Sequence, residues 1–122
     1  MRRLVIAIPT ALCAVGIVVA AASAHTGLVS RSPDRGETAA VGLKRVSATF
    51  SEPLAQGSIV VRRIRAGVPR GVRGRGGVSA ADPTKLVAHS PAGLRRGGYQ
   101  VEARATTADG HTQVYRWGFR VE

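Results

Sequence analysis

The stretch YRWGFRV, residues 115–121, decides the fold class. Apolar and polar side chains alternate along it, and the apolar set is Tyr115, Trp117, Phe119 and Val121. Successive side chains of a β-strand point to opposite faces, so this period of two predicts a strand with one buried and one solvated face. A strand of that kind is typical of antiparallel sheets, which can leave one face open to water.

The same alternation recurs upstream. It is found in RVSATFS and YQVEARAT, which are residues 45–51 and 99–106. SIVVRRI, residues 58–64, is rich in β-branched residues, and TKLVAHS, residues 84–90, is another short strand candidate. Clusters of Gly, Pro, Asp and Ser separate these segments, and no segment has the apolar spacing of an amphipathic helix. Several short strands at regular spacing predict an all-β domain, either an antiparallel β-sandwich or a small barrel.

The first 24 residues have the three-part form of a secretory signal peptide. Arginines are followed by a long apolar run, and small residues, Ala22 and Ala24, stand where signal peptidase needs them. The alternative is an uncleaved membrane anchor, because Leu4–Ala22 approaches the length that spans a bilayer. The well-formed cleavage site favours removal. We therefore expect cleavage between Ala24 and His25, which leaves residues 25–122 as one domain exported to the periplasm or the cell surface.

Cleavage would also change the composition of the chain. It would remove the only cysteine, the only methionine and two arginines, so the formal net charge falls from +11 to +9. The mature domain then has neither a disulfide framework nor a sulfur donor for a soft metal ion. A strongly basic domain often indicates nucleic acid binding. Export argues against a nucleic acid partner and leaves acidic surface polymers, a membrane partner or a merely solvated basic face.

Arginine and glycine dominate residues 62–77, within the segment RRIRAGVPRGVRGRGGVSAADP. This composition is similar to that of disordered RNA-binding segments. Because the segment lies between two predicted strands of an exported chain, we interpret it as a long hairpin loop. Glycine would supply its turn conformations, and arginine would keep an edge strand from pairing with other molecules.

The sequence contains three histidines, His25, His89 and His111. In ADGH, residues 108–111, Asp109 and His111 are two positions apart, a spacing that can place both side chains on one face. An ordinary turn with a surface histidine would have the same sequence, so this motif alone is weak. His89 has no partner at ligand spacing, and we expect it to be an exposed turn residue.

A histidine at the mature amino terminus makes the metal-binding interpretation of ADGH stronger than that of an ordinary turn. His25 would offer its α-amine and its ring nitrogen to the same metal ion, and an amine with an ordinary pKa near ~8 readily loses its proton to a bound cation. Together with the ring of His111 and the carboxylate of Asp109, this gives three nitrogens and one oxygen. A tetragonal N/O site without sulfur suits Cu(II) among the first-row ions.

The chain resembles the CopC-type copper resistance proteins. The resemblance rests on AHTGLVSRSPDRGE, ATFSEPL, ADPTKL and GGYQVEARATTADGH, at residues 24–37, 48–54, 81–86 and 97–111, together with the aromatic last strand. It implies an immunoglobulin-like Greek-key β-sandwich over residues 25–122, outside the cytoplasm.

The resemblance also implies the ligands of one Cu(II) ion per chain. The amino-terminal histidine and the Asp-x-His pair of the family fall on His25, Asp109 and His111. The methionine-rich Cu(I) site of some members is not expected, because the mature chain has no methionine. Glu52 is either an acceptor in the outer shell of the metal or an ordinary carboxylate at a strand end. The implied partners are copper and a membrane copper transporter of the CopD type, with the protein itself monomeric.

We therefore expect an exported Cu(II)-binding protein for buffering, sequestration or delivery of copper, and not an enzyme. One alternative is a copper monooxygenase, because such enzymes also hold copper with an amino-terminal histidine. Asp109 would then occupy a position that oxygen activation needs open. The other alternative is a basic β-sandwich that docks on acidic polymers or on a membrane partner without any metal.

Overall fold

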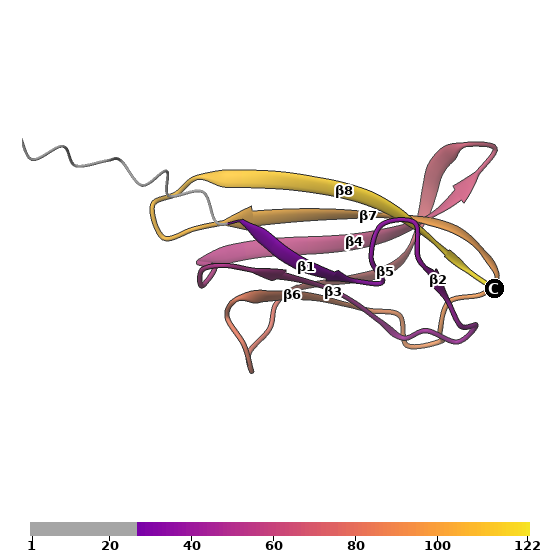
Figure 1. Cartoon of the computed structure of the whole chain (residues 1–122), viewed down its shortest axis with the longest axis horizontal. Coiled ribbons are helices and arrows are strands. Elements are labelled where there is room, and N and C mark those ends of the chain that lie inside the picture. Colours follow the sequence, from indigo (N-terminus) through magenta and orange to yellow (C-terminus); the bar gives the residue numbers. More distant parts are fainter. Residues whose placement is uncertain (1–26) are drawn as a thin grey trace, which may run out of the picture.

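The computed structural model describes residues 27–122, and in this range it consists of strands, turns and loops (Figure 1). The strands are β1 (Leu28–Ser32), β2 (Thr38–Ala39), β3 (Arg45–Phe50), β4 (Gln56–Arg65), β5 (Val68–Val78), β6 (Lys85–His89), β7 (Gly97–Thr106) and β8 (Thr112–Val121). Over these residues there is no helix long and apolar enough to cross a membrane.

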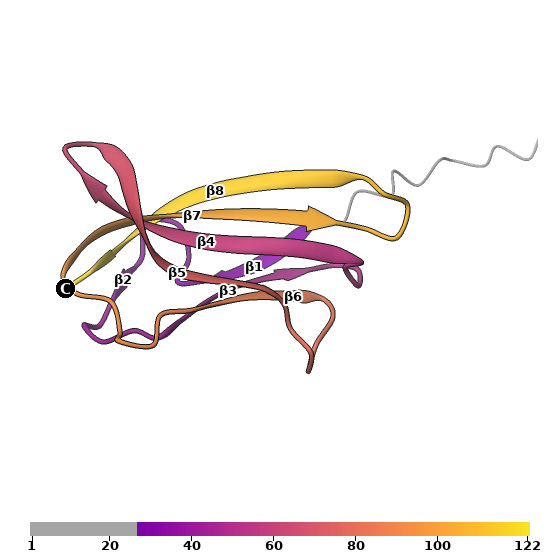
Figure 2. The ribbon, with the colours of Figure 1, turned by 180° about the vertical axis from the view of Figure 1, so that it is seen from behind.

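The strands form one sheet in the order β1-β3-β6-β5-β4-β7-β8-β2. All neighbours are antiparallel except β2 and β8, which are parallel. The sheet curls so that β4, β7 and β8 face β1, β3 and β6 across a core, with β5 running from one layer to the other (Figures 1 and 2). The chain changes layer between β3 and β4 and again between β6 and β7. This arrangement confirms the predicted all-β, immunoglobulin-like Greek-key fold.

The core follows the predicted alternation. The apolar side chains of one face of β7 and β8 are buried, namely Tyr99, Val101, Ala103, Ala105, Trp117, Phe119 and Val121. Across the core, the ring of Phe50 on β3 lies 5.7 Å from the ring of Tyr115 on β8, centroid to centroid. Each fully buried large apolar side chain stabilises the fold by about 1.5–3 kcal/mol. Since the domain described has no disulfide, this packing holds the two layers together.

Tyr99 fixes the corner where the chain enters β7. Its hydroxyl donates a hydrogen bond to the carbonyl oxygen of Arg95 over 2.6 Å, and its ring stacks on Phe119 with centroids 5.5 Å apart. A tyrosine that bonds back to the backbone a few residues upstream is the tyrosine corner of immunoglobulin-like domains.

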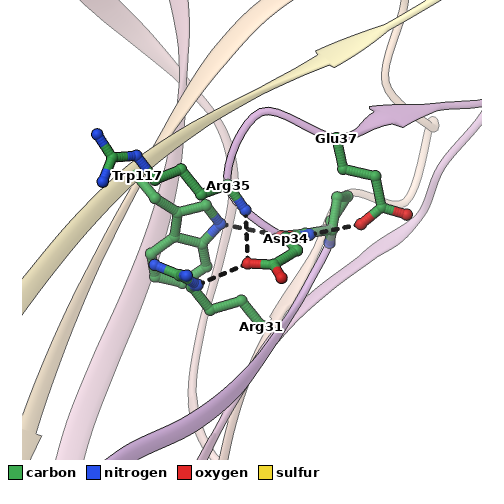
Figure 3. Close-up of polar contacts among 6 residues, drawn as sticks. Arg31, Asp34, Arg35, Glu37 and Trp117 are labelled. Atoms are coloured by element: carbon green, nitrogen blue, oxygen red, sulfur yellow. Dashed lines mark hydrogen bonds and ion pairs between the residues drawn. The ribbon is translucent and has the colours of Figure 1, made fainter.

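The segment between β1 and β2 connects the two outer strands of the sheet (Figure 3). Trp117 Nε1 donates to the buried carbonyl oxygen of Pro33 over 3.0 Å, and the guanidinium of Arg31 lies 5.8 Å from the tryptophan ring. Asp34 accepts from the backbone N–H of Arg35 and from Arg31 Nε. The Arg35 hydrogen bond and then the charge of Arg31 hold the pKa of Asp34 below its ordinary value.

The predicted hairpin loop over residues 62–77 is wrong. These residues form the outer part of β4 and most of β5, joined by a tight turn at Ala66 and Gly67, and the end of the hairpin at this turn stands away from the sandwich (Figure 1). The glycine content of this segment predicts a loop, but here glycine allows strands to approach closely. A Cβ atom on Gly76 would overlap the carbonyl oxygen of Val87 on β6.

Strands β1 and β2 also lay outside the sequence prediction. They are five and two residues long, and β1 is mostly exposed or half-buried, so neither has the alternation that revealed the other strands.

Candidate metal centre

One end of the sandwich brings together the start of β1, the loop after β3 and the β7–β8 turn (Figure 1). Gly27 N donates to Ser51 Oγ, and Ser51 N donates to the Gly27 carbonyl oxygen, each over 2.9 Å. Ala55 N, from the same loop, donates to the carbonyl oxygen of Thr106 over 2.8 Å. The first described residue of the chain and the turn that carries Asp109 are therefore tied to one short loop.

The β7–β8 turn has a defined backbone. Thr107 N donates to the carbonyl oxygen of His111 over 3.1 Å, and Gly110 N donates to that of Thr107 over 2.9 Å. Gly110 has a φ of 85°, in the left-handed region that glycine adopts without strain. The glycine of ADGH thus bends the chain so that the residues on either side of it can meet.

Asp109 and His111 do meet. His111 Nδ1 lies 2.9 Å from Asp109 Oδ2, and His111 N donates to Asp109 Oδ1 over 3.1 Å. The buried hydroxyl of Thr107 also donates to Oδ1. The His111 side chain is 70% exposed and that of Asp109 32%. The buried Thr107 hydroxyl thus holds the Asp109 carboxylate in place, while the His111 imidazole faces solvent.

These hydrogen bonds lower the pKa of Asp109 to about 2. The hydrogen bond from the Thr107 hydroxyl contributes most, followed by those from the backbone N–H and the ring of His111. The carboxylate is therefore ionised throughout the physiological pH range and can serve as an anionic ligand.

The donor pair fits a small divalent ion. Two ligands at adjacent corners of a square plane, each about 2.0–2.1 Å from a metal, lie about 2.9 Å apart. The observed separation of Nδ1 and Oδ2 has this value. Hence the same two atoms can share a proton or adjoin one ion. Nitrogen and oxygen donors without sulfur are the set that Cu(II) accepts.

The predicted ligand set is only partly within the described residues. His25 lies outside them, and within residues 27–122 no group of three or more metal-binding side chains is found. Glu52 is exposed in the loop that also holds Ser51, at the same end of the sandwich. His89 is the exposed last residue of β6, paired in register with Arg45 at the far end of β3. It is therefore remote from Asp109 and His111.

Thr107 is the contributor that sequence reasoning missed. Its buried hydroxyl holds Asp109 in place and is the main cause of the low carboxylate pKa. The signal available was a threonine two residues before an aspartate, a spacing at which a hydroxyl and a carboxylate can bond within one turn.

Fold and turn together define a class: an immunoglobulin-like β-sandwich with a carboxylate–imidazole pair at one end. The sequence profile of the CopC domain matches residues 28–122, and the chain belongs to the CopC family.

Solved structures agree with this assignment. The crystal structure of CopC from Methylosinus trichosporium OB3b is 27% identical, with a TM-score of 0.67, over 80% of this chain and 94% of that one. The structure of PcoC from Escherichia coli, a methionine-rich copper resistance protein, is 25% identical, with a TM-score of 0.67, over 81% of this chain and all of that one (100%). No curated protein sequence matches the chain.

Proposed function

We propose that this protein is an exported Cu(II)-binding protein for copper homeostasis or resistance. One Cu(II) ion per chain is held by His25, as the mature amino terminus, together with Asp109 and His111. The observation that carries the proposal is the Asp109–His111 pair, whose Nδ1 and Oδ2 atoms lie 2.9 Å apart, at the end of the domain where the described chain begins. The copper resistance of the related PcoC supports the choice of metal.

The position of Gly27 supports a role for His25. Gly27 forms hydrogen bonds with Ser51, and the same loop forms a hydrogen bond with Thr106. Thr106 directly precedes residues 107–111, the β7–β8 turn that we call the metal-binding turn. His25 precedes Gly27 by two residues, which span at most about 7 Å of chain. Its amine and ring nitrogens therefore have only a short distance to cover from that end of the sandwich.

Each proposed ligand has a distinct role. The α-amine and ring of His25 close a chelate ring, and the ring of His111 supplies a third nitrogen. Asp109 supplies an anionic oxygen that partly neutralises the ion, and its low pKa keeps protons from competing for it. Glu52 is the candidate acceptor for a ligand N–H, because its loop borders the same end.

This donor set favours binding over catalysis. Three nitrogens and a carboxylate fill a square plane and leave no equatorial position for oxygen. The protein would buffer or sequester copper outside the cytoplasm, in the periplasm or at the cell surface, or deliver it to a membrane transporter of the CopD type.

The test compares two mature proteins that both begin at His25, one with a free α-amine and one in which that amine is acetylated. Acetylation turns the chelating amine into an amide, so we expect Cu(II) affinity to fall more than about 100-fold, beyond the loss typical of an outer-shell residue. Titration with Cu(II) and EPR spectra of both proteins measure this. Equal affinities and identical spectra would refute the chelate.

Two histidine variants complete the test. His111→Ala should weaken Cu(II) binding by a similar factor, because it removes one of the three nitrogens. His89→Ala is the matched control and should leave the affinity unchanged, since that residue is at the far end of the sandwich. Mass spectrometry of the protein secreted by cells should give His25 as its first residue.

A further inference from the structure

A basic cavity of about 700 Å³ lies at the end of the domain opposite the metal-binding turn. The β4–β5 hairpin contributes Arg63, Arg65 and Arg73 to its lining, and the segment before β7 contributes Arg95 and Arg96. Tyr99, near the start of β7, also lines it. Seven residues of extended strand, roughly 23 Å, separate Tyr99 from Thr106 beside the metal-binding turn. The cavity is thus independent of the site described above.

The charge of this cavity is not balanced by the protein. No aspartate or glutamate lines it. None of its five arginines forms an ion pair within residues 27–122, where the arginines that do are Arg31, Arg104, Arg116 and Arg120. Other arginines of the described domain, such as Arg35 and Arg45, also lack an ion pair, but only here do five unpaired arginines line one cavity.

Among these arginines, Arg63 contacts the protein on two sides. Its guanidinium lies 5.6 Å from the centre of the Tyr99 ring, and its Nη1 donates to the Tyr99 hydroxyl over 3.4 Å. On the other side it lies against Gly97, where a Cβ atom would come within 2.7 Å of the guanidinium carbon. A side chain at position 97 would therefore displace Arg63.

The Arg63 side chain is also incompletely satisfied. Its Nε atom is buried and has no hydrogen-bond partner among the described residues. Burying a charged group without an anion or a full set of acceptors costs free energy. A planar guanidinium that is held against a tyrosine, partly buried and without a carboxylate partner suits an anion that the protein itself does not supply.

We propose that this cavity binds a discrete anion that carries several phosphate groups. The five arginines that line the cavity carry more charge and more N–H donors than one carboxylate can use, whereas each phosphate group offers several acceptor oxygens. The cavity volume is within the range of sites for small ligands. Because the arginines line a hollow, they suit a small soluble anion better than the headgroups of a flat membrane surface.

The test measures the binding of inorganic tripolyphosphate to the metal-free mature protein by calorimetry. The decisive variant is Arg73→Gln with Arg96→Gln, since both side chains are exposed and their replacement leaves the core intact. We expect it to weaken binding by about tenfold or more, because charge-assisted hydrogen bonds to the anion are lost. The matched control is Arg35→Gln with Arg45→Gln, which removes the same charge outside the cavity and should change the affinity less than about twofold.

Two further variants make the test specific. Arg63→Lys keeps the charge but loses the planar fork, so it should also weaken tripolyphosphate binding. His111→Ala should have no effect on it, which separates this cavity from the proposed copper site.

Three results would overturn the proposal: no binding of tripolyphosphate, equal losses in the cavity and control variants, or binding only to vesicles of phosphatidylglycerol. The last result would assign the arginines to a membrane surface. Loss in the cavity variant alone, with phosphatidylcholine vesicles inert, supports the site.

Discussion

At the scale of single residues, the turn that we propose to bind copper depends on a threonine that is not itself a proposed ligand. Thr107 is buried, and its hydroxyl donates to the carboxylate of Asp109, a proposed ligand. A fixed carboxylate has less conformational freedom to lose when an ion binds, so outer-shell hydrogen bonds of this kind raise affinity. Thr107 is therefore part of the proposed site although it touches no metal.

Thr107→Val should raise the pKa of Asp109 from about 2 toward its ordinary value of 3.8, because it removes the largest cause of the shift. The shape of the side chain is nearly unchanged. NMR titration of the Asp109 carboxyl carbon measures the pKa directly. Thr106→Val is the control, since the Thr106 hydroxyl bonds Thr112 and does not touch Asp109. An unchanged Asp109 midpoint in Thr107→Val would rule out this role.

The same shift has a defined effect on stability. A carboxyl group whose folded-state pKa is lowered stabilises the fold above its unfolded-state pKa, and loses that contribution as the pH falls through the folded-state value. For Asp109 the contribution is complete above about pH 5 and disappears as the pH falls toward 2. Thr107→Val should reduce this part of the acid dependence.

The sequence revealed part of the site and not the rest, for physical reasons. Asp109 and His111 are close in the chain, so their spacing around Gly110 already indicated that they could meet. The hydrogen bond from Thr107 depends on how the turn is folded, and only the structure shows it. The arginine cavity joins residues from two distant segments, so nothing in their spacing predicts it.

At the scale of elements, β5 is a strand that glycine makes possible. Gly76 packs so closely against β6 that a Cβ atom there would overlap the Val87 carbonyl oxygen. Sequence patterns detect strands by apolar alternation, which β5 lacks because most of its residues are exposed or glycine. Strands β3, β4, β6, β7 and β8 were predictable because each buries alternate side chains. Register and close approach between strands depend on long-range packing, which alternation does not encode.

Gly76→Ala should destabilise the fold by about 3 kcal/mol or more, because the overlap is with backbone that cannot move without breaking the β5–β6 pairing. Urea unfolding followed by the fluorescence of the only tryptophan measures it.

The control for this experiment lies in the same strand. At Gly71 an added Cβ atom would meet only the flexible end of Arg73, so Gly71→Ala should change the free energy of unfolding by about 1 kcal/mol or less. Similar losses in both variants would mean that glycine in β5 matters only for chain flexibility.

At the scale of the whole molecule, the contact between Trp117 and Pro33 connects parts of the sheet that its strand order places far apart. Trp117 is on β8, and Pro33 follows β1, which is the opposite outer strand. The hydrogen bond between them (Figure 3) joins the segment after β1 to β8, alongside the bond from Gly36 N to the Gly118 carbonyl oxygen and the pairing of β2 with β8. The alternation of the last strand predicted that Trp117 is buried, but its partner 84 positions away was not predictable.

Trp117→Phe should lower the free energy of unfolding by about 2–4 kcal/mol, because it leaves the buried Pro33 carbonyl oxygen without its donor and opens a small cavity. Urea unfolding followed by circular dichroism measures the loss.

Arg31→Gln serves as the comparison, since it removes only the half-exposed ion pair with Asp34 and the contact with the indole ring. It should cost about 1 kcal/mol or less. If the two variants were equally destabilising, the hydrogen bond to Pro33 would not be the main contribution of Trp117.

The exposure of the His111 ring affects how a copper ion bound at the proposed site would pass to another protein. Because 70% of this side chain is open to solvent in the turn of the β7–β8 hairpin, donor atoms of a second protein can approach it without any unfolding. Copper held there could pass to an acceptor by stepwise ligand substitution, one bond replaced before the next is broken. Handover would then be governed by collision and relative affinity, and the free ion would never be released into the surrounding water.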